Sequence, residues 1–448
     1  MRPSESNHPE RKKKENDLRK DRSERGKKLM MEKLEMGLTK LSAKFSNNAF
    51  LNIIMGAFMM LMPMTMTGSI ASLLNAITLA PYQNFLASTG IGAGLTAIYQ
   101  FTVGILAIWI VFGVGHSYAS KKGLTRSAVT VGLVAIAAFL TVTPYDPAGG
   151  NLPTSWLASQ GMFVGIIIGF MTGAIFRFCQ EKDIQIKLPK QVPPMVAQQF
   201  SAILPAVFTL TLALILRTIF SFTSFGNMHQ AVYTLVATPL YAAGANIFGL
   251  FILSTMLTMF WFFGIHGGMT VYPIIMMLFM PLQMENLAAF QAGLPRPNMV
   301  CGTSLMVGTG SLTILCAIFL IAKSKTLRSI AKLAIVPSFF GVDEPAYFGI
   351  PVILNPIFFL PFTILANVIT IFGTYLLQIL HLLPAATGAS VGFNLPFFVT
   401  NFVQFGWAGA LWGCVLFVLT ILVYIPFIRT LDKQMLAQEA EQETAAQA

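Results

Sequence analysis

Long apolar stretches recur along most of the chain, separated by short polar, basic or glycine- and proline-containing segments. An α-helix needs about 20 predominantly apolar residues to cross the hydrocarbon core of a bilayer. Stretches of this character cover residues 50–79, 95–117, 128–142, 157–176, 200–220, 245–264, 300–321, 352–380 and 402–427. The pattern predicts an all-α integral membrane protein.

A further apolar stretch, residues 269–284, is shorter and carries Pro273 and Pro281. It either crosses the membrane or dips in and returns. Lys and Arg in short loops mark the cytoplasmic side of a membrane protein. Here the basic clusters lie at 121–126, 177–190, 323–332 and 429–433. If 269–284 crosses, this pattern predicts about ten transmembrane helices with both termini in the cytoplasm.

Two segments are too broken to be ordinary spans. Residues 335–351 contain Pro337, Pro345 and Pro351, and residues 384–396 contain two prolines and two glycines. Irregular backbone at membrane depth is tolerated only where protein or a water-filled cavity satisfies its polar groups. We expect two re-entrant hairpins near a binding site, and loops outside the membrane are the alternative for each.

The composition agrees with a membrane environment and locates the polar parts. The chain is 55% hydrophobic and 10% charged, whereas a soluble domain is about 25% charged. Of its 29 Lys and Arg residues, 14 lie in residues 1–44. We interpret this segment as a basic cytoplasmic tail facing anionic lipid, so the net charge of +11 does not require a nucleic-acid partner. Residues 45–430 are then the membrane domain, and 431–448 a cytoplasmic C-terminal tail.

The four cysteines stand singly in apolar surroundings, without a CxxC motif or a neighbouring histidine. This pattern favours neither a disulfide framework nor a metal site. We expect no metal and no cofactor.

One candidate site is the sequence WFFGIHGG at residues 261–268. His266 stands between glycines at the end of a predicted span, where it can donate, accept or carry a proton. Gly267 permits a turn and the close approach of a ligand to the backbone. Trp261 is a candidate platform for the apolar face of a sugar ring. The alternative for His266 is a cap on a helix end.

A second candidate site is the sequence GVDEPAYFGIP at residues 341–351. Ionisable residues among apolar ones are costly in a membrane and mark functional sites by default. A partly desolvated carboxylate such as Glu344 can accept a proton from a sugar hydroxyl, and Asp343 is a candidate substrate ligand beside it. Either carboxylate could instead face the cytoplasm. His116 and Asn394 are further candidate ligands, although His116 could serve structure alone.

With these residues in view, the chain resembles the lactose/cellobiose/diacetylchitobiose class of enzyme IIC, the permease component of the phosphoenolpyruvate-dependent sugar phosphotransferase system. The resemblance extends over about residues 41–439. Its most specific motifs are WFFGIHG at 261–267 and DEPAYFGIPVILNP at 343–356, and others are IQIKLPKQVPP at 184–194 and YIPFIRTLDK at 424–433.

The resemblance implies a homodimer in the bacterial cell membrane, with a dimerisation half at about 45–225 and a substrate-binding half at about 240–430. It implies that His266 and Glu344 face the hydroxyl that becomes phosphorylated. The substrate would be a β-linked disaccharide, and the phosphoryl group would come to its C6 hydroxyl from a cysteine of enzyme IIB. No IIA or IIB domain is attached, so both partners are expected as separate chains.

The sequence departs from the commoner family pattern at 385–401, which leaves the identity of the disaccharide open. Two other functions also remain open from the residues alone. A cation-coupled sugar symporter would use Glu344 and His266 as a proton relay and deliver free sugar. A membrane sugar sensor would bind sugar without transport and signal through its basic tail.

Overall fold

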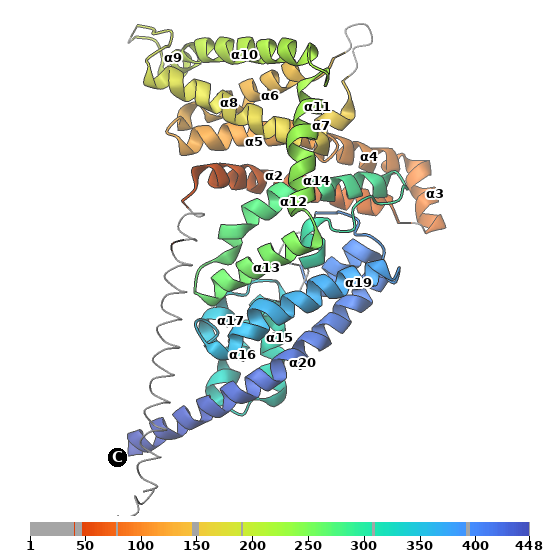
Figure 1. The fold of residues 1–448 in the computed structure, drawn as a ribbon, viewed down its shortest axis with the longest axis vertical. Coiled ribbons are helices and arrows are strands. Elements are labelled where there is room, and N and C mark those ends of the chain that lie inside the picture. The colour runs from red at the N-terminus through yellow and green to blue at the C-terminus, as the bar shows by residue number, and fades with distance from the viewer. Residues whose placement is uncertain are drawn as a thin grey trace, which may run out of the picture.

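The computed structural model describes residues 40, 47–77, 79–145, 152–189, 191–306, 310–390 and 395–447. Nearly all of the predicted N-terminal tail, and Asn394, lie outside these described residues. Within them, the ordered elements are all helices. The helices form two stacked groups, the first half of the chain at the top of Figure 1 and the second half below it. This arrangement confirms the predicted all-α membrane fold.

The first half is a bundle whose helices pack side by side (Figure 1). They are α2 (Ala49–Asn75), α3 (Ala80–Thr89), α4 (Ile91–Thr102), α5 (Leu106–Lys121), α6 (Ala128–Val142), α7 (Thr154–Leu157), α8 (Met162–Glu181), α9 (Pro194–Ser201) and α10 (Ile203–Ser221). Ile110, Phe139 and Ile168 are completely buried where α5, α6 and α8 meet. In contrast, α10 exposes large apolar side chains such as Phe208 and Leu214.

A connector of three short helices joins the two halves. It consists of α11 (Met228–Val232), the π-helical turn η3 (Tyr233–Ala237) and α12 (Thr238–Gly244). His229 is buried in this connector, and its Nε2 lies 2.9 Å from the Thr143 hydroxyl at the end of α6. This contact fixes the start of the connector against the first half.

The second half contains longer helices interrupted by turns. They are α13 (Ile247–Phe262), α14 (Gly267–Gln291), η4 (Gly302–Met306), α15 (Leu312–Ile321), α16 (Lys325–Phe339), α17 (Glu344–Gly349), α18 (Pro356–Leu360), η5 (Pro361–Leu365), η6 (Val368–Phe372), α19 (Gly373–Ile379) and α20 (Phe397–Gln447). α20 is kinked at Gly406, whose φ of 70° is readily adopted by glycine.

By length and composition, seven helices in the described part of the chain could cross a membrane, or up to nine if each of two bent helix pairs is one span. They correspond to the predicted stretches with one difference, at 300–321. There only α15 is an apolar helix, and its ten residues extend about 15 Å, half the hydrocarbon thickness of about 30 Å. Gly302 and Gly310, which precede α15 in the sequence, have positive φ angles, so no single helix runs through both positions and into α15.

The two broken segments are indeed not spanning helices. Around 335–351 the chain leaves α16, turns at 340–343 and enters the short helix α17. Residues 383–390 are non-helical, and Ala386 and Ala389 within them are completely buried. Their re-entry into a bilayer stays a prediction.

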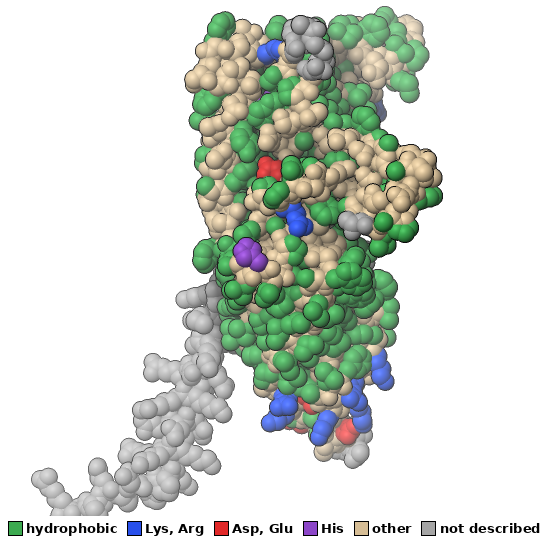
Figure 2. All heavy atoms as spheres, turned by 90° about the vertical axis from the view of Figure 1, so that its right-hand side faces the viewer, with side chains coloured by type: hydrophobic (Ala, Val, Ile, Leu, Met, Phe, Trp, Pro, Cys, Tyr) green, Lys and Arg blue, Asp and Glu red, His purple; other side chains and the backbone are tan. Residues whose placement is uncertain are grey.

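The outer surface matches a membrane environment. In the face shown in Figure 2, apolar side chains cover most of the middle, and Lys and Arg side chains gather at the lower end. That end corresponds to the bottom of Figure 1, where α16 begins and the C-terminal part of α20 leaves the bundle. Large apolar side chains such as Leu320 and Leu333 are exposed in the second half.

Candidate functional site

His266 and Glu344 lie together, although they are distant in sequence. Nε2 of His266 is 3.6 Å from Oε1 of Glu344, and the two side chains are 49% and 45% exposed. This distance is longer than a direct N–H···O hydrogen bond. Both side chains are therefore accessible from solvent.

The turn between α13 and α14 positions His266. α13 ends at Phe262, and Gly264 then adopts a φ of 74°. At Gly267, an added Cβ would lie 1.9 Å from the carbonyl oxygen of Leu257, so only glycine fits there. Gly267 thus serves the packing of α14 on α13, and its own contact with a ligand stays a prediction.

One backbone hydrogen bond joins the two sequence motifs. The amide of Leu354, just after the α17 hairpin, donates to the carbonyl of Phe262 at 2.9 Å. Trp261 packs between the motifs, with ring-centroid distances of 4.4 Å to His266 and 5.5 Å to Tyr347. Trp261 is only 9% exposed. The Trp261 ring packs against His266 and positions it. Because so little of this ring is exposed, it does not offer a sugar a large open stacking surface in this conformation.

Asp343 has a different environment from its neighbour Glu344. Its Oδ1 accepts hydrogen bonds from the Ser311 amide at 2.9 Å and the Ser311 hydroxyl at 2.6 Å. The hydroxyls of Ser311 and Ser338 are 2.7 Å apart. A Cβ at Gly310 would come within 2.8 Å of both Asp343 carboxylate oxygens. Asp343 therefore fastens the hairpin turn to the start of α15.

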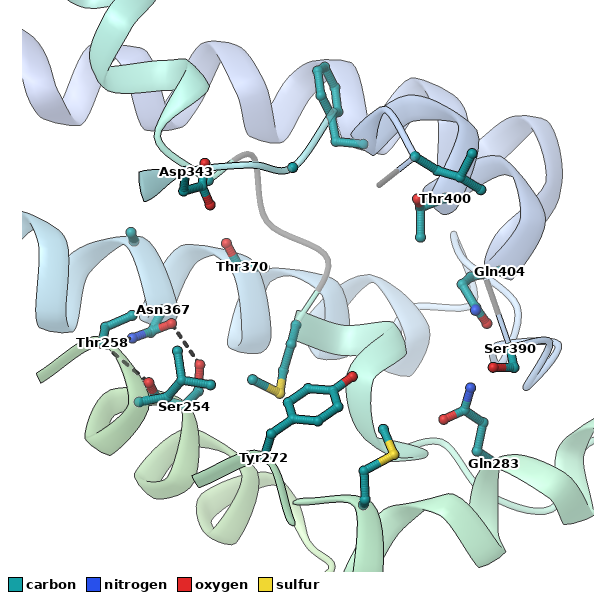
Figure 3. Close-up of a pocket in the computed structure, with 18 of the residues that line it drawn as sticks. Ser254, Thr258, Tyr272, Gln283, Asp343, Asn367, Thr370, Ser390, Thr400 and Gln404 are labelled. Atoms are coloured by element: carbon teal, nitrogen blue, oxygen red, sulfur yellow. Dashed lines mark hydrogen bonds between the residues drawn. The ribbon is translucent and has the colours of Figure 1, made fainter. Parts of the chain in front are cut away.

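A cavity of about 430 Å³ lies beside this hairpin, between the two halves of the molecule. This volume falls in the range of small-molecule sites. Methionine and phenylalanine side chains form much of its wall, including Met55 and Phe58 of α2 and Met276 and Met280 of α14. The cavity also has polar groups on several sides (Figure 3).

The first polar group of the cavity combines α13 with the π-helical region after α18. Ser254 donates to Oδ1 of Asn367 at 2.8 Å, and Nδ2 of Asn367 donates to the Thr258 hydroxyl at 2.9 Å (Figure 3). Thr370 lies on the same wall. These groups have fixed orientations and retain hydroxyl lone pairs that a ligand can use.

The second polar group comprises Gln283, Ser390, Thr400 and Gln404, at the other side of Figure 3. Nε2 of Gln404 donates to the Ala389 carbonyl at 2.8 Å, and the Ser390 amide donates to the hydroxyl oxygen of Ser69 in the first half at 2.9 Å. Ala389 and Ser390 of the non-helical 383–390 segment thus line this end of the cavity. Mixed apolar walls and polar edges are suited to a sugar, which has both kinds of surface.

Asp343 and Tyr347 of the hairpin line the cavity, while His266 and Glu344 are not among its lining residues. The structure therefore brings His266, Glu344, Trp261, Gly267 and Asp343 into one region, with the His266–Glu344 pair beside the cavity rather than inside it.

The other sequence candidates lie elsewhere. His116 is in α5 of the first half, where its ring stacks on Phe112 at 5.9 Å, and it does not line the cavity. Asn394 falls outside the described residues. No group of three or more potential metal ligands occurs in the described part of the chain.

Comparison with known proteins places these features in a family. Residues 55–366 match the family described as "Phosphotransferase system, EIIC". The chain is 33% identical to the oligo-beta-mannoside-specific EIIC component of Bacillus subtilis (strain 168), across 93% of this chain and 98% of that protein. It is 28% identical to the cellobiose-specific EIIC component of Geobacillus stearothermophilus, across 91% and 95%.

A solved structure supports the same relationship. The fold is similar to the transporter ChbC, the IIC component from the N,N'-diacetylchitobiose-specific phosphotransferase system, with a TM-score of 0.85 and 29% sequence identity over 91% of this chain and 99% of that one. The match extends through both halves of the molecule and both motifs. This protein belongs to the EIIC family, the multi-helical membrane permeases of the phosphotransferase system.

Proposed function

We propose that this chain binds a β-linked disaccharide and carries it across the bacterial cell membrane while enzyme IIB phosphorylates its C6 hydroxyl. The observation that carries the proposal is the His266–Glu344 pair beside a cavity of about 430 Å³. Relatives named for cellobiose, lactose and oligo-beta-mannosides support the substrate class. Family membership favours this function over a cation-coupled symporter or a non-transporting sensor.

In this proposal, one sugar ring reaches the charged pair and the remainder occupies the cavity. The methionine and phenylalanine walls contact the apolar faces of the sugar, while Asn367, Thr370, Gln283 and Gln404 bind hydroxyl groups. Asp343 shapes this end through its bonds to Ser311. Trp261 supports the sugar by holding His266 in place.

The proposed reaction is a phosphoryl transfer from a phosphocysteine of IIB. Glu344 accepts the C6 hydroxyl proton as the C6 oxygen bonds to phosphorus, and the S–P bond breaks to leave the IIB cysteine as a thiolate. His266 orients the hydroxyl by a hydrogen bond. Such transfers depend mainly on positioning and charge stabilisation, and a half-exposed pair gives the IIB phosphoryl group access.

The membrane arrangement is part of the proposal. The first half forms a homodimer, and support for this comes from the large apolar side chains that α10 leaves exposed, such as Phe208 and Leu214. Both termini lie in the cytoplasm, where the basic loops and the basic tail contact anionic lipid. Separate IIA and IIB chains bind on the same side.

The test is uptake of radiolabelled cellobiose, diacetylchitobiose and mannobiose into cells that express this chain with its IIA and IIB partners. Free and phosphorylated sugar are then separated. We expect accumulation of one sugar as its phosphate and none without IIB. Accumulation of free sugar independent of IIB would contradict the proposal and favour the symporter.

A further inference from the structure

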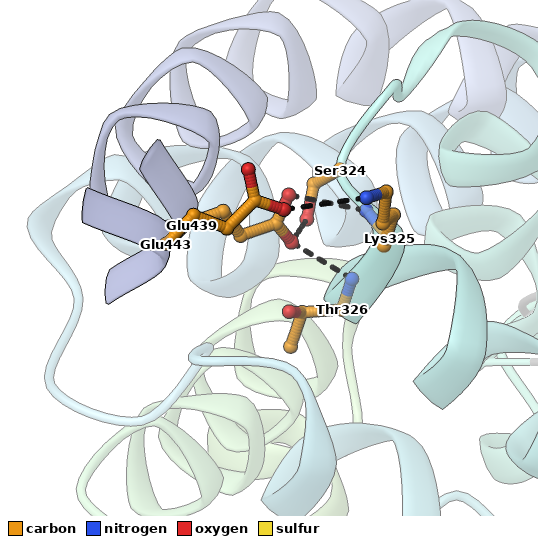
Figure 4. Close-up of polar contacts among 5 residues, drawn as sticks. All are labelled: Ser324, Lys325, Thr326, Glu439 and Glu443. Carbon is orange, nitrogen blue, oxygen red and sulfur yellow. Dashed lines mark hydrogen bonds and ion pairs between the residues drawn. The ribbon is translucent and has the colours of Figure 1, made fainter. Parts of the chain in front are cut away.

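Two carboxylates of the C-terminal helix hold the beginning of α16. Oδ1 of Asp432 accepts the backbone amides of Lys323 and Ser324 at 2.9 and 2.8 Å. Oε1 of Glu439 accepts the Ser324 hydroxyl at 2.7 Å and the Thr326 amide at 2.9 Å, and its Oε2 accepts the Lys325 amide at 3.3 Å. Figure 4 shows Glu439 reaching from α20 to this segment.

These contacts meet a specific need of the α16 N-terminus. The first amides of a helix have no partner within the helix, and their partial positive charge favours nearby carboxylates. The Ser324 hydroxyl also accepts the Leu327 amide at 3.2 Å. Asp432 and Glu439 lie two helical turns apart and hence on one face of α20. We call these two residues and their 323–326 partners the α16 clamp.

α16 packs one face against the core of the second half. It buries Leu327 near its N-terminus and Ala331 and Ala334 in its middle, while Leu333 and Val336 on the other side are exposed. Alanines allow close approach but offer little side-chain interlocking against sliding along the helix axis. The directional hydrogen bonds at the N-terminus therefore add to the packing of Leu327 in fixing the register of α16.

The clamp is connected to the reacting pair through one continuous element. α16 extends roughly 22 Å from the clamp to its C-terminus, where Ser338 lies beside Ser311 and Asp343. The next residue, Glu344, begins α17 and faces His266. A shift of α16 along its axis would carry Glu344 with it.

We infer that Asp432 and Glu439 are positioning residues that set the register of α16 and thereby place Glu344 against His266 for phosphoryl transfer. They touch neither the cavity nor the pair, so they act through α16. This inference rests on the proposed function, because its readout is sugar phosphorylation. The inference gives a role to Asp432, the acidic residue of the YIPFIRTLDK motif, and to Glu439 in the C-terminal part of α20.

The experiment uses membrane vesicles with the full chain, phosphoenolpyruvate and the soluble phosphotransferase components. The sugar is the one identified in the uptake assay. Glu439→Ala removes three hydrogen bonds, whereas Glu439→Gln keeps an oxygen acceptor and loses the charge. Glu441→Ala is the matched control, because Glu441 is an exposed carboxylate of the same helix without a hydrogen bond to the described residues.

For Glu439→Ala we expect the kcat of sugar phosphorylation to fall about tenfold while the sugar Kd stays within about twofold, since small misplacements of reacting groups cost rate more than binding. The kcat of Glu439→Gln should lie between those of Glu439→Ala and wild type, and the kcat of the Glu441→Ala control should equal that of wild type. Asp432→Asn, which keeps an acceptor in a buried position, should also lower kcat selectively and replaces Glu439→Ala if that variant does not accumulate.

Unchanged kcat in the Glu439 and Asp432 variants would overturn the inference. An equal loss of sugar binding and kcat would also overturn it, because it would indicate general destabilisation. The wild-type measurement distinguishes failure of this inference from failure of the proposed function. If the wild-type chain forms no sugar phosphate under these conditions, the proposed function itself fails.

Discussion

The neighbouring carboxylates Asp343 and Glu344 have separate tasks because their environments differ. Asp343 is bonded to Ser311, which fixes the hairpin, and Glu344 remains half exposed beside His266. Of the two, Glu344 is therefore the carboxylate that an incoming hydroxyl can reach beside His266.

Ser311→Ala tests the structural task of Asp343. The substitution removes the hydroxyl bond to a buried carboxylate and should cost about 1–3 kcal/mol. We expect a lower melting temperature of the detergent-purified protein. Ser329→Ala, at an exposed position of α16, is the control and should change stability by less than about 0.5 kcal/mol. Equal melting temperatures would show that the Asp343–Ser311 contact is dispensable.

His266→Ala tests the ligand role of the histidine. Loss of a polar partner for a sugar hydroxyl should weaken binding by about 1–3 kcal/mol, measured by equilibrium binding of labelled disaccharide to the purified protein. His381→Asn is a suitable control, because His381 is exposed and has a φ of 57° that asparagine tolerates. If the His266 variant binds sugar normally, the histidine serves only the turn.

For individual residues, the sequence singled out His266 and Glu344, which the structure brings together, but not the polar residues that line the cavity. His266 and Glu344 were predictable because charged or titratable groups are conspicuous in apolar sequence. Ser254, Asn367 and Gln404 were missed, although uncharged polar residues inside predicted spans were a usable signal. The burial of Trp261 could not be predicted, because it depends on the contact between two distant motifs.

Among the helices, the α13–α14 turn is the element on which the site most directly depends. Its geometry requires glycine at position 267, where any Cβ would meet the Leu257 carbonyl. The turn then presents His266 at the end of two packed helices. A substitution in this turn should therefore disturb the site more than it disturbs the rest of the fold.

Gly267→Ala should therefore displace the start of α14 and reduce both stability and sugar affinity. The clash is with backbone, which cannot rotate away, and overpacking typically costs about 1–3 kcal/mol. Thermal unfolding and sugar binding of the purified protein measure the two effects. Gly94→Ala in α4 is the control, because an added Cβ there meets nothing within 4 Å. Normal binding by the Gly267 variant would disprove this dependence.

Hydrophobic patterning predicted most helices because lipid selects long apolar segments irrespective of tertiary contacts. It was wrong about a continuous span at 300–321, where glycine conformations and the packing of η4 and α15 interrupt the helix. It was right that 335–351 and 384–396 are not spans. The bends between α4 and α5 and between α12 and α13 were not part of the prediction.

For the whole molecule, the position of the cavity between the two halves matters most. α2 of the first half contributes Met55, Phe58 and Met62, and the second half contributes the polar groups and the hairpin. Relative movement of the halves would change the cavity and its access together. The proposed division into a dimerising first half and a substrate-binding second half stays a prediction.

The most direct test of the account is sugar phosphorylation by Glu344→Gln in membrane vesicles with phospho-IIB. The substitution keeps the size and polarity of the side chain but removes its ability to accept the hydroxyl proton. General-base catalysis contributes about 10²–10⁴-fold, so we predict at least about a 10²-fold loss of phosphorylation with sugar binding near the wild-type value and a fully active Glu181→Gln control. Phosphorylation at the wild-type rate would contradict the assignment of Glu344 as the base.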